Sequence, residues 1–234
     1  MSRCLYCDSW LEEELSWSAL VYPKPEMPLC EDCFSRLTLI RGRRCRLCSR
    51  SLERLDPNFV KGEECRDCQL WEQDEEWRGV LESSFSLYEY NDFFKEVLAR
   101  FKYRGDYVLA GIFATVLKAS LKRLNYDVAV PIPLSSERLL ERGFNQTKAL
   151  LDTAGIRAED LLVRMHGEKQ SKKTRAERLR LQAIFQLKDG LDISGKTVLL
   201  VDDLYTTGST LRQAARILKK GGAKKVAAIT LARS

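Results

Sequence analysis

The hydrophobic pattern of the chain alternates between strand-like and helix-like segments. Apolar runs at 128–132 and 198–201 predict central parallel strands, the first over 127–132, that are covered on both faces. Apolar residues at helical spacing predict helices over 93–104, 108–124, 144–154 and 211–220, the last of which ends at Gly221 and Gly222. Shorter apolar segments predict strands within 80–90 and at 161–164, 184–187 and 226–231. This order predicts an α/β domain with a mostly parallel sheet flanked by helices.

Two acids and a hydroxyl-rich turn follow the strand at 198–201. Residues 198–210 read V-L-L-V-D-D-L-Y-T-T-G-S-T, so Asp202 and Asp203 emerge at the carboxyl end of a parallel strand, where α/β sheets bind ligands. Paired carboxylates suit the 2′- and 3′-hydroxyls of a ribose, and both are candidate catalytic residues. The turn offers successive N–H groups and hydroxyls before a helix that starts near Leu211, which suits a 5′-phosphate. Its residues are Thr206, Thr207, Gly208, Ser209 and Thr210. An acidic strand end followed by an ordinary capped helix is the alternative.

A second apolar strand leads into a segment that carries arginines. Residues 128–146 read V-A-V-P-I-P-L-S-S-E-R-L-L-E-R-G-F-N-Q, and the two prolines hold the chain extended after the strand. Ser135 or Ser136 can cap a short helix that carries Arg138 and Arg142. Because guanidinium groups bind phosphate oxygens in pairs, we expect this segment to bind a diphosphate. A solvated helix face is the alternative interpretation.

All eight cysteines lie within the first 68 residues as four C-x-x-C pairs. Two residues between thiolates let both bind one tetrahedral Zn²⁺ from a tight turn. Pairing in chain order gives C-x2-C-x22-C-x2-C and C-x2-C-x16-C-x2-C, which predicts two structural Cys4 zinc sites; interleaved pairing and disulfides are the alternatives. The predicted ligands are Cys4, Cys7, Cys30 and Cys33, and Cys45, Cys48, Cys65 and Cys68.

These motifs resemble those of known families. Segment 198–210 resembles the signature of the type I phosphoribosyltransferases. Together with V-P-I-P-L-S, R-G-F-N-Q and the cysteine pattern, it resembles the ComF family, in particular its ComFC type, over essentially the whole chain. The resemblance implies that the two acids and the turn bind phosphoribosyl pyrophosphate (PRPP), with Mg²⁺ bridging pyrophosphate and sugar. It also implies a role in DNA uptake during natural transformation, without fixing a reaction.

Length and charge indicate two parts. The first 75 residues carry 11 Lys+Arg and 15 Asp+Glu, net −4, whereas residues 76–234 carry 28 and 18, net +10. A segment as short as 1–75 needs metal to stabilise a small core. We therefore predict a zinc module at 1–75 and a phosphoribosyltransferase-like domain at 76–234.

Arginines cluster around the second and third cysteine pairs. Seven of them lie between residues 36 and 54, against the single acid Glu53. We hypothesise that this cluster binds single-stranded DNA, to which nearby tryptophans would add base stacking. Solubility, or compensation of the negative zinc–thiolate centres, is the alternative, and packing is favoured for most of the tryptophans. The candidate DNA-binding residues are Arg41, Arg43, Arg44 and Arg46.

Residues 168–180 carry six basic and two acidic side chains with little apolar anchoring. In phosphoribosyltransferases, a flexible loop in this part of the fold closes over the active site. The candidate loop residues are Lys169, Lys172, Lys173 and Arg175, for which a solvated surface is the alternative.

The chain shows neither a leader-like start nor about twenty consecutive apolar residues, so we expect a cytoplasmic protein without a membrane span. Three functions fit. The first is a competence factor that binds PRPP and handles incoming single-stranded DNA with competence or recombination proteins such as a helicase. The second is a salvage phosphoribosyltransferase, with its base under a hood formed by 88–94 or by the zinc module. The third uses the pocket only as a sensor.

Overall fold

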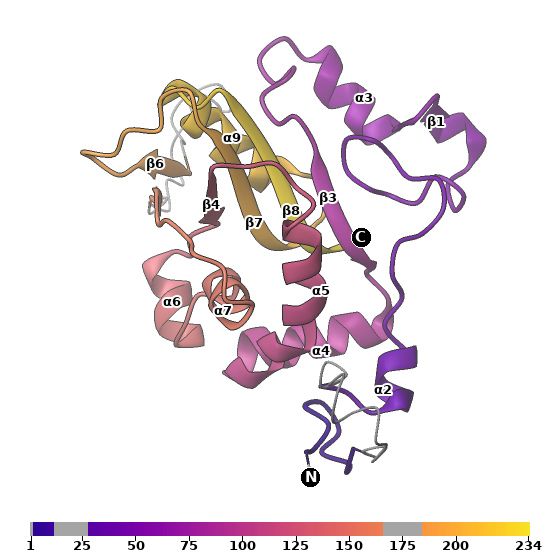
Figure 1. The fold of residues 1–234 in the computed structure, drawn as a ribbon. Coiled ribbons are helices and arrows are strands. Elements are labelled where there is room, and N and C mark those ends of the chain that lie inside the picture. Colours follow the sequence, from indigo (N-terminus) through magenta and orange to yellow (C-terminus); the bar gives the residue numbers. More distant parts are fainter. Residues whose placement is uncertain (1, 12–27, 166–183) are drawn as a thin grey trace, which may run out of the picture.

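Four parallel strands form the centre of the molecule (Figure 1). The computed structural model describes residues 2–11, 28–165 and 184–234. Within these, β3 (Ser84–Glu89), β8 (Lys225–Arg233), β7 (Thr197–Tyr205) and β4 (Val128–Pro131) lie in that order, and each neighbouring pair is parallel. The predicted α/β fold with a parallel sheet is therefore confirmed.

Helices cover both faces of this sheet. One face packs against α4 (Asp92–Tyr103), α5 (Gly111–Leu121) and α7 (Gln146–Thr153), whereas α9 (Ser209–Lys220) packs on the other. Alternation along β7 explains the division, because Leu199 faces the α4 side while Val198 and Leu200 face α9. Both faces are buried, as the continuous apolar run predicts.

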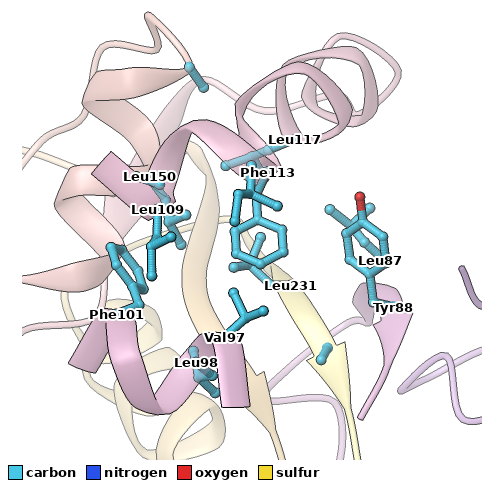
Figure 2. Packing of buried hydrophobic residues seen from close by; sticks show 14 of the residues in the cluster. Leu87, Tyr88, Val97, Leu98, Phe101, Leu109, Phe113, Leu117, Leu150 and Leu231 are labelled. Atoms are coloured by element: carbon cyan, nitrogen blue, oxygen red, sulfur yellow. The ribbon is translucent and has the colours of Figure 1, made fainter. Parts of the chain in front are cut away.

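The core on the α4 face is rich in aromatic residues (Figure 2). The ring of Phe113 lies 5.4 Å from that of Phe94 and 5.8 Å from that of Tyr88, measured between centroids. Helix α4 begins where the Asn91 side chain accepts a hydrogen bond from the backbone N–H of Phe94, so the cap places the aromatic face of the helix. Its apolar residues recur at helical spacing, which is why the sequence predicts this element well.

The helix predicted at 108–124 is divided. A 3-10 turn, η2 (Tyr107–Ala110), precedes α5, and α5 ends at Leu121. The predicted strands at 161–164 and 184–187 exist as β5 (Leu162–Arg164) and β6 (Phe185–Leu187), but they form a separate antiparallel hairpin that packs beside α9. Periodicity finds such short strands but does not show which sheet they join.

The N-terminal part lies along the edge of the sheet. Helix α2 (Glu31–Ser35) lies near α4, whereas β1 (Val60–Lys61), β2 (Glu64–Cys65) and α3 (Arg66–Gln73) lie beyond β3, on the opposite side of the molecule (Figure 1). A short 3-10 turn, η1 (Pro57–Phe59), precedes β1. Residues 38–40 pair with the edge of β3, since the N–H of Ile40 donates to the carbonyl of Leu87 at 2.9 Å. The N-terminal part thus covers an otherwise open sheet edge.

In the parts of the chain that the structure describes, every helix is too short or too polar to cross a bilayer.

Candidate phosphate and metal sites

The turn after β7 is the centre of the candidate site. The strand continues past Val201 to Tyr205, because Asp202 and Leu204 extend the pairing with β8. Helix α9 begins at Ser209, two residues before the predicted Leu211. The two acids therefore lie within the end of the strand, and residues 206–208 alone form the turn.

The backbone N–H groups of this turn are uncommitted. Within residues 2–11, 28–165 and 184–234, no hydrogen bond is made by the amides of Thr206, Thr207, Gly208 or Thr210. The amide of Ser209 donates to the side-chain oxygen of Thr207 at 3.3 Å. Four such donors at the start of a helix of twelve residues are groups that can bind an anion.

Gly208 allows the turn to close. Its φ of 80° lies in the left-handed region, and a Cβ atom there would come within 2.2 Å of the Tyr205 hydroxyl and 2.4 Å of Arg212 Nη1. Arg212 Nη1 donates to that hydroxyl at 2.7 Å. The backbone thus approaches two buried side chains too closely for any larger residue.

The two carboxylates have different surroundings. Asp203 forms an ion pair with Lys102 of α4, whose Nζ lies 2.8 Å from Oδ1 and 2.7 Å from Oδ2. For Asp202, burial and then the charge of Asp203 raise the pKa to about 7. Lys102, near the end of α4, was not among the predicted site residues.

Arg138, Arg142 and Arg164 lie near one another, and Arg164 lies near Asp202 at the end of β7. The short helix α6 (Ser136–Arg142) carries Arg138 and Arg142 one turn apart, and the Ser135 hydroxyl caps it by accepting from the N–H of Arg138 at 3.3 Å. Arg142 donates to Gln146 Oε1 at 2.9 Å. The cap at Ser135 is one of the two that the sequence predicts.

The third arginine, Arg164 at the end of β5, was missed by the sequence analysis. Burial lowers the pKa of its guanidinium, the charges of Arg138 and Arg142 lower it further, and Asp202 raises it. The three arginines and one acid therefore share an electrostatic neighbourhood with an excess of positive charge. The sequence marks Arg164 only by its place at the end of a short predicted strand.

The predicted loop residues Lys169, Lys172, Lys173 and Arg175 lie outside the described residues. In the described chain on either side of them, the N–H of Met165 donates to the carbonyl of Ile184 at 2.8 Å and extends the hairpin that carries Arg164.

Eight cysteines form two groups in chain order. In each group the four sulfur atoms lie within 4.8 Å of one another, and the groups are Cys4, Cys7, Cys30 and Cys33, and Cys45, Cys48, Cys65 and Cys68. We call them the first and second cysteine clusters. Four cysteine sulfur atoms this close together are consistent with a structural zinc site, and the interleaved pairing is ruled out.

The arginine cluster is mostly engaged within the fold. Ion pairs join Arg46 to Glu64, Arg50 to Asp67, Arg54 to Glu89 and Arg36 to Glu96. The guanidinium of Arg44 lies 5.1 Å from the centre of the Phe85 ring. Arg41 and Arg43 are exposed, and their side chains have no ion pair in the described part of the chain. Acids outside residues 36–54 thus neutralise most of the arginine charges that the sequence of that segment leaves unpaired.

The base hood suggested at 88–94 is not supported. Tyr88, Phe93 and Phe94 are buried in the core, where burial also raises the pKa of Tyr88 to about 12. These aromatic residues stabilise the fold and have no surface for a base.

The parallel sheet and the turn after β7 define a phosphoribosyltransferase-like domain, and residues 139–234 match the family model of the phosphoribosyl transferase domain. Two relatives match over nearly the full length of this chain. The chain is 41% identical over 235 residues to the competence protein ComFC of Bacillus subtilis (strain 168), which covers 99% of this chain and 95% of that protein. It is 35% identical over 235 residues to the competence protein ComFC of Streptococcus pneumoniae (strain ATCC BAA-255 / R6). That match covers 99% of this chain and 100% of that protein. The chain belongs to the ComFC family of competence proteins.

Among solved structures, this chain is similar to the allosteric regulatory enzyme of purine biosynthesis, with 22% identity and a TM-score of 0.38. The similarity covers 52% of this chain and 25% of that enzyme's chain.

Proposed function

We propose that this competence protein binds PRPP with Mg²⁺ in its phosphoribosyltransferase domain and acts on incoming single-stranded DNA. The observation that carries the PRPP proposal is the turn at 206–208, with free amides on Thr206, Thr207 and Gly208 at the start of α9. These donors suit a dianionic 5′-phosphate, which gains both the hydrogen bonds and the helix dipole.

The remaining groups of the site suit the rest of PRPP. Asp202 and Asp203 would accept hydrogen bonds from the ribose hydroxyls, and Arg138 and Arg142 would bind the pyrophosphate with the bridging Mg²⁺. Arg164 adds a positive charge to the same region. We assign Lys169, Lys172, Lys173 and Arg175 to a loop that covers bound PRPP, because the hairpin from which they extend carries Arg164.

Thermal unfolding with PRPP and Mg²⁺ tests the pocket. At a hundred times its dissociation constant, a ligand of the folded state adds about 2.7 kcal/mol of stability. For a chain of this size, that corresponds to a rise of about 5 to 10 °C in melting temperature. Arg138→Ser/Arg142→Ser should lose most of the rise with PRPP but keep a response to ribose 5-phosphate. No rise for the wild-type protein would contradict the proposal.

Catalysis is a separate question from binding. A true transferase would release pyrophosphate from PRPP when a base is added, whereas a sensor or DNA-handling factor would bind PRPP without base-dependent turnover. Pyrophosphate release, measured with each common base in turn, distinguishes the two.

We propose that each cysteine cluster holds one structural Zn²⁺. The chemistry of the donor set supports this, since closed Cys4 sites are tetrahedral and take no part in reactions. Metal analysis should find two zinc ions per chain, and Cys7→Ser should reduce the number to one. Retention of two zinc ions by Cys7→Ser would contradict the assignment of the first cluster.

Of the four candidate DNA-binding arginines, Arg46 is in an ion pair and Arg44 lies over the Phe85 ring, so we propose Arg41 and Arg43 as the DNA contacts. Each contact to a single-stranded phosphate contributes about 0.7 to the slope of log affinity against log salt. Arg41→Ser/Arg43→Ser should therefore lower that slope by about 1.4. Arg46→Ser, which breaks an ion pair with Glu64, is the matched control. An unchanged slope in the double variant would contradict a contact at Arg41 and Arg43 and would favour one at residues 168–180.

A further inference from the structure

The second cysteine cluster is joined directly to the phosphate turn. Helix α3 begins after Cys65 and carries Cys68 in its first turn. Trp71 lies three residues farther along, and therefore on the same side of the helix as Cys68. Its indole Nε1–H donates to the backbone carbonyl of Thr207 at 3.0 Å.

This hydrogen bond fixes the orientation of the peptide between Thr207 and Gly208. The peptide between Thr207 and Gly208 is trans, so its carbonyl and its N–H point in opposite directions. Because Trp71 holds the carbonyl on the α3 side, the N–H of Gly208 is held toward the opposite side, away from α3. Without Trp71, this peptide could rotate and turn an acceptor toward the phosphate.

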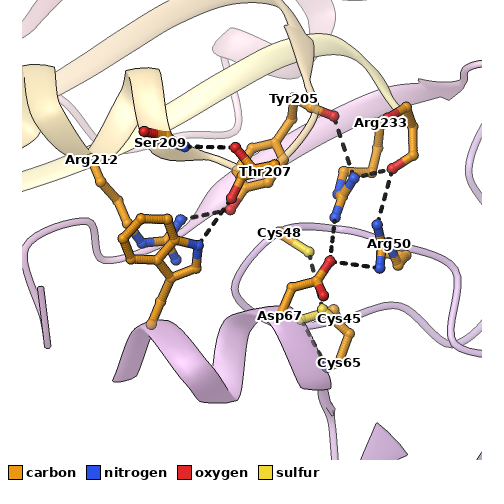
Figure 3. Close-up of polar contacts among 12 residues, drawn as sticks. Cys45, Cys48, Arg50, Cys65, Asp67, Tyr205, Thr207, Ser209, Arg212 and Arg233 are labelled. Carbon is orange, nitrogen blue, oxygen red and sulfur yellow. Dashed lines mark hydrogen bonds and ion pairs between the residues drawn. The ribbon is translucent and has the colours of Figure 1, made fainter. Parts of the chain in front are cut away.

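A buried arginine completes the support (Figure 3). Arg212 is 1% exposed, and the centre of its guanidinium lies 4.6 Å from the centre of the Trp71 ring. Its Nη1 donates to Tyr205, and both groups lie directly against Gly208. Thr207, Arg212 and Tyr205 thus lie together above α3, whose start carries Cys65 and Asp67 of the zinc-binding part.

We propose that Trp71 is a positioning residue for the phosphate turn, and that zinc in the second cysteine cluster sets the affinity for PRPP by fixing α3. This inference rests on the proposed PRPP function. Within the described residues, the first cluster makes no hydrogen bond to the turn at 206–208; it packs near α4 in the other core. Coupling between two binding sites is reciprocal, so bound PRPP must also retain zinc in the second cluster.

The variant Trp71→Phe keeps an aromatic ring over Arg212 but lacks the N–H donor. We expect its affinity for PRPP with Mg²⁺, measured by calorimetry, to fall about fivefold or more, with two zinc ions retained and the cooperative unfolding transition preserved. The matched control is Trp10→Phe, since Trp10 is 59% exposed near the first cluster and should bind PRPP as the wild type does.

Zinc release gives a readout that a purely structural role would not change. With excess chelator, PRPP should slow the release of one of the two zinc ions in the wild type, and Trp71→Phe should lose most of this protection. Equal PRPP affinity and equal protection in Trp71→Phe and wild type would overturn the inference alone. If the wild-type protein fails to bind PRPP at all, the proposed function fails first and the inference with it.

Discussion

Gly208 has a left-handed backbone conformation and lies in close contact with two buried side chains. The distance from its virtual Cβ to the Tyr205 hydroxyl, 2.2 Å, is shorter than any real contact of that type, so even alanine must displace Tyr205 or Arg212. The sequence indicates a glycine turn at this position, from the T-T-G-S-T string. It does not indicate that Arg212, four residues later, is buried against it, because a solitary arginine on a helix is usually exposed.

Gly208→Ala should therefore destabilise the protein by about 2 to 3 kcal/mol, from backbone strain and displacement of Arg212. Gly190→Ala is the matched control, because Gly190 has a φ of 75° and no atom within 4 Å of its virtual Cβ. Chemical denaturation of both variants separates the two effects. A similar loss in both would mean that the contacts at Gly208 add nothing to the strain.

Asp202 carries a pH dependence of stability with a defined sign. Because its pKa is raised to about 7 in the folded protein, the native state binds a proton more tightly than the unfolded chain between about pH 4 and pH 7. Stability from this group therefore decreases as the pH rises through that range, and its destabilising effect is complete above pH 7.

Asp202→Asn removes this effect. We expect its melting temperature to exceed that of the wild type by about 2 to 4 °C at pH 8, or about 1 kcal/mol, and by much less at pH 5. Asp189→Asn removes an exposed carboxylate and serves as the control. An Asp202→Asn difference that is the same at both pH values would contradict the raised pKa.

At the scale of elements, the sequence predicts the strands and helices that are continuous and periodic. It places α4, α9 and β4 to within about two residues and offers the capping serine of α6 as one of two candidates. It ends β7 too early, because acids are unusual inside a strand and the Lys102 ammonium that accommodates Asp203 comes from a helix about a hundred residues earlier. Contacts of that range leave no periodic signal.

The ion pair between α4 and β7 is the clearest such contact. The Lys102 side chain is 17% exposed and that of Asp203 is 10% exposed, so Lys102→Met leaves a largely buried carboxylate without a partner. We expect a loss of about 1.5 to 3 kcal/mol in chemical denaturation. The double variant Lys102→Met/Asp203→Asn should recover part of it. Additive losses would show that the pair is not coupled.

At the scale of the whole molecule, the two cysteine clusters belong to different hydrophobic cores. The first packs with Phe93 and Phe113 beneath α4, and the second packs with Val198 and Leu211 beside α9. Spacing predicts the pairing of the cysteines, since it follows chain order. It cannot place the two clusters at opposite ends of β3, because that depends on how residues 38–40 pair with the sheet edge.

The domain boundary at residue 75 is still a prediction, and a fragment of residues 76–234 tests its physical meaning. Removing residues 1–75 would uncover Leu81 and Tyr88 and take Leu47 and Leu52 out of the second core. We therefore expect the fragment to lack a cooperative thermal transition, measured beside the full chain. Cooperative unfolding of the fragment at the full-length temperature would mean that the N-terminal part is a separate appendage.

The central claim is that main-chain amides of the turn after β7 bind the 5′-phosphate of a ribose. Amide ¹⁵N–¹H spectra recorded during titration with ribose 5-phosphate test it most directly. The expected result is a saturable downfield shift of the Thr206, Thr207, Gly208 and Thr210 protons, which is smaller in Trp71→Phe. Shifts confined to α6 and the β5–β6 hairpin, with these four amides unchanged, would contradict the claim.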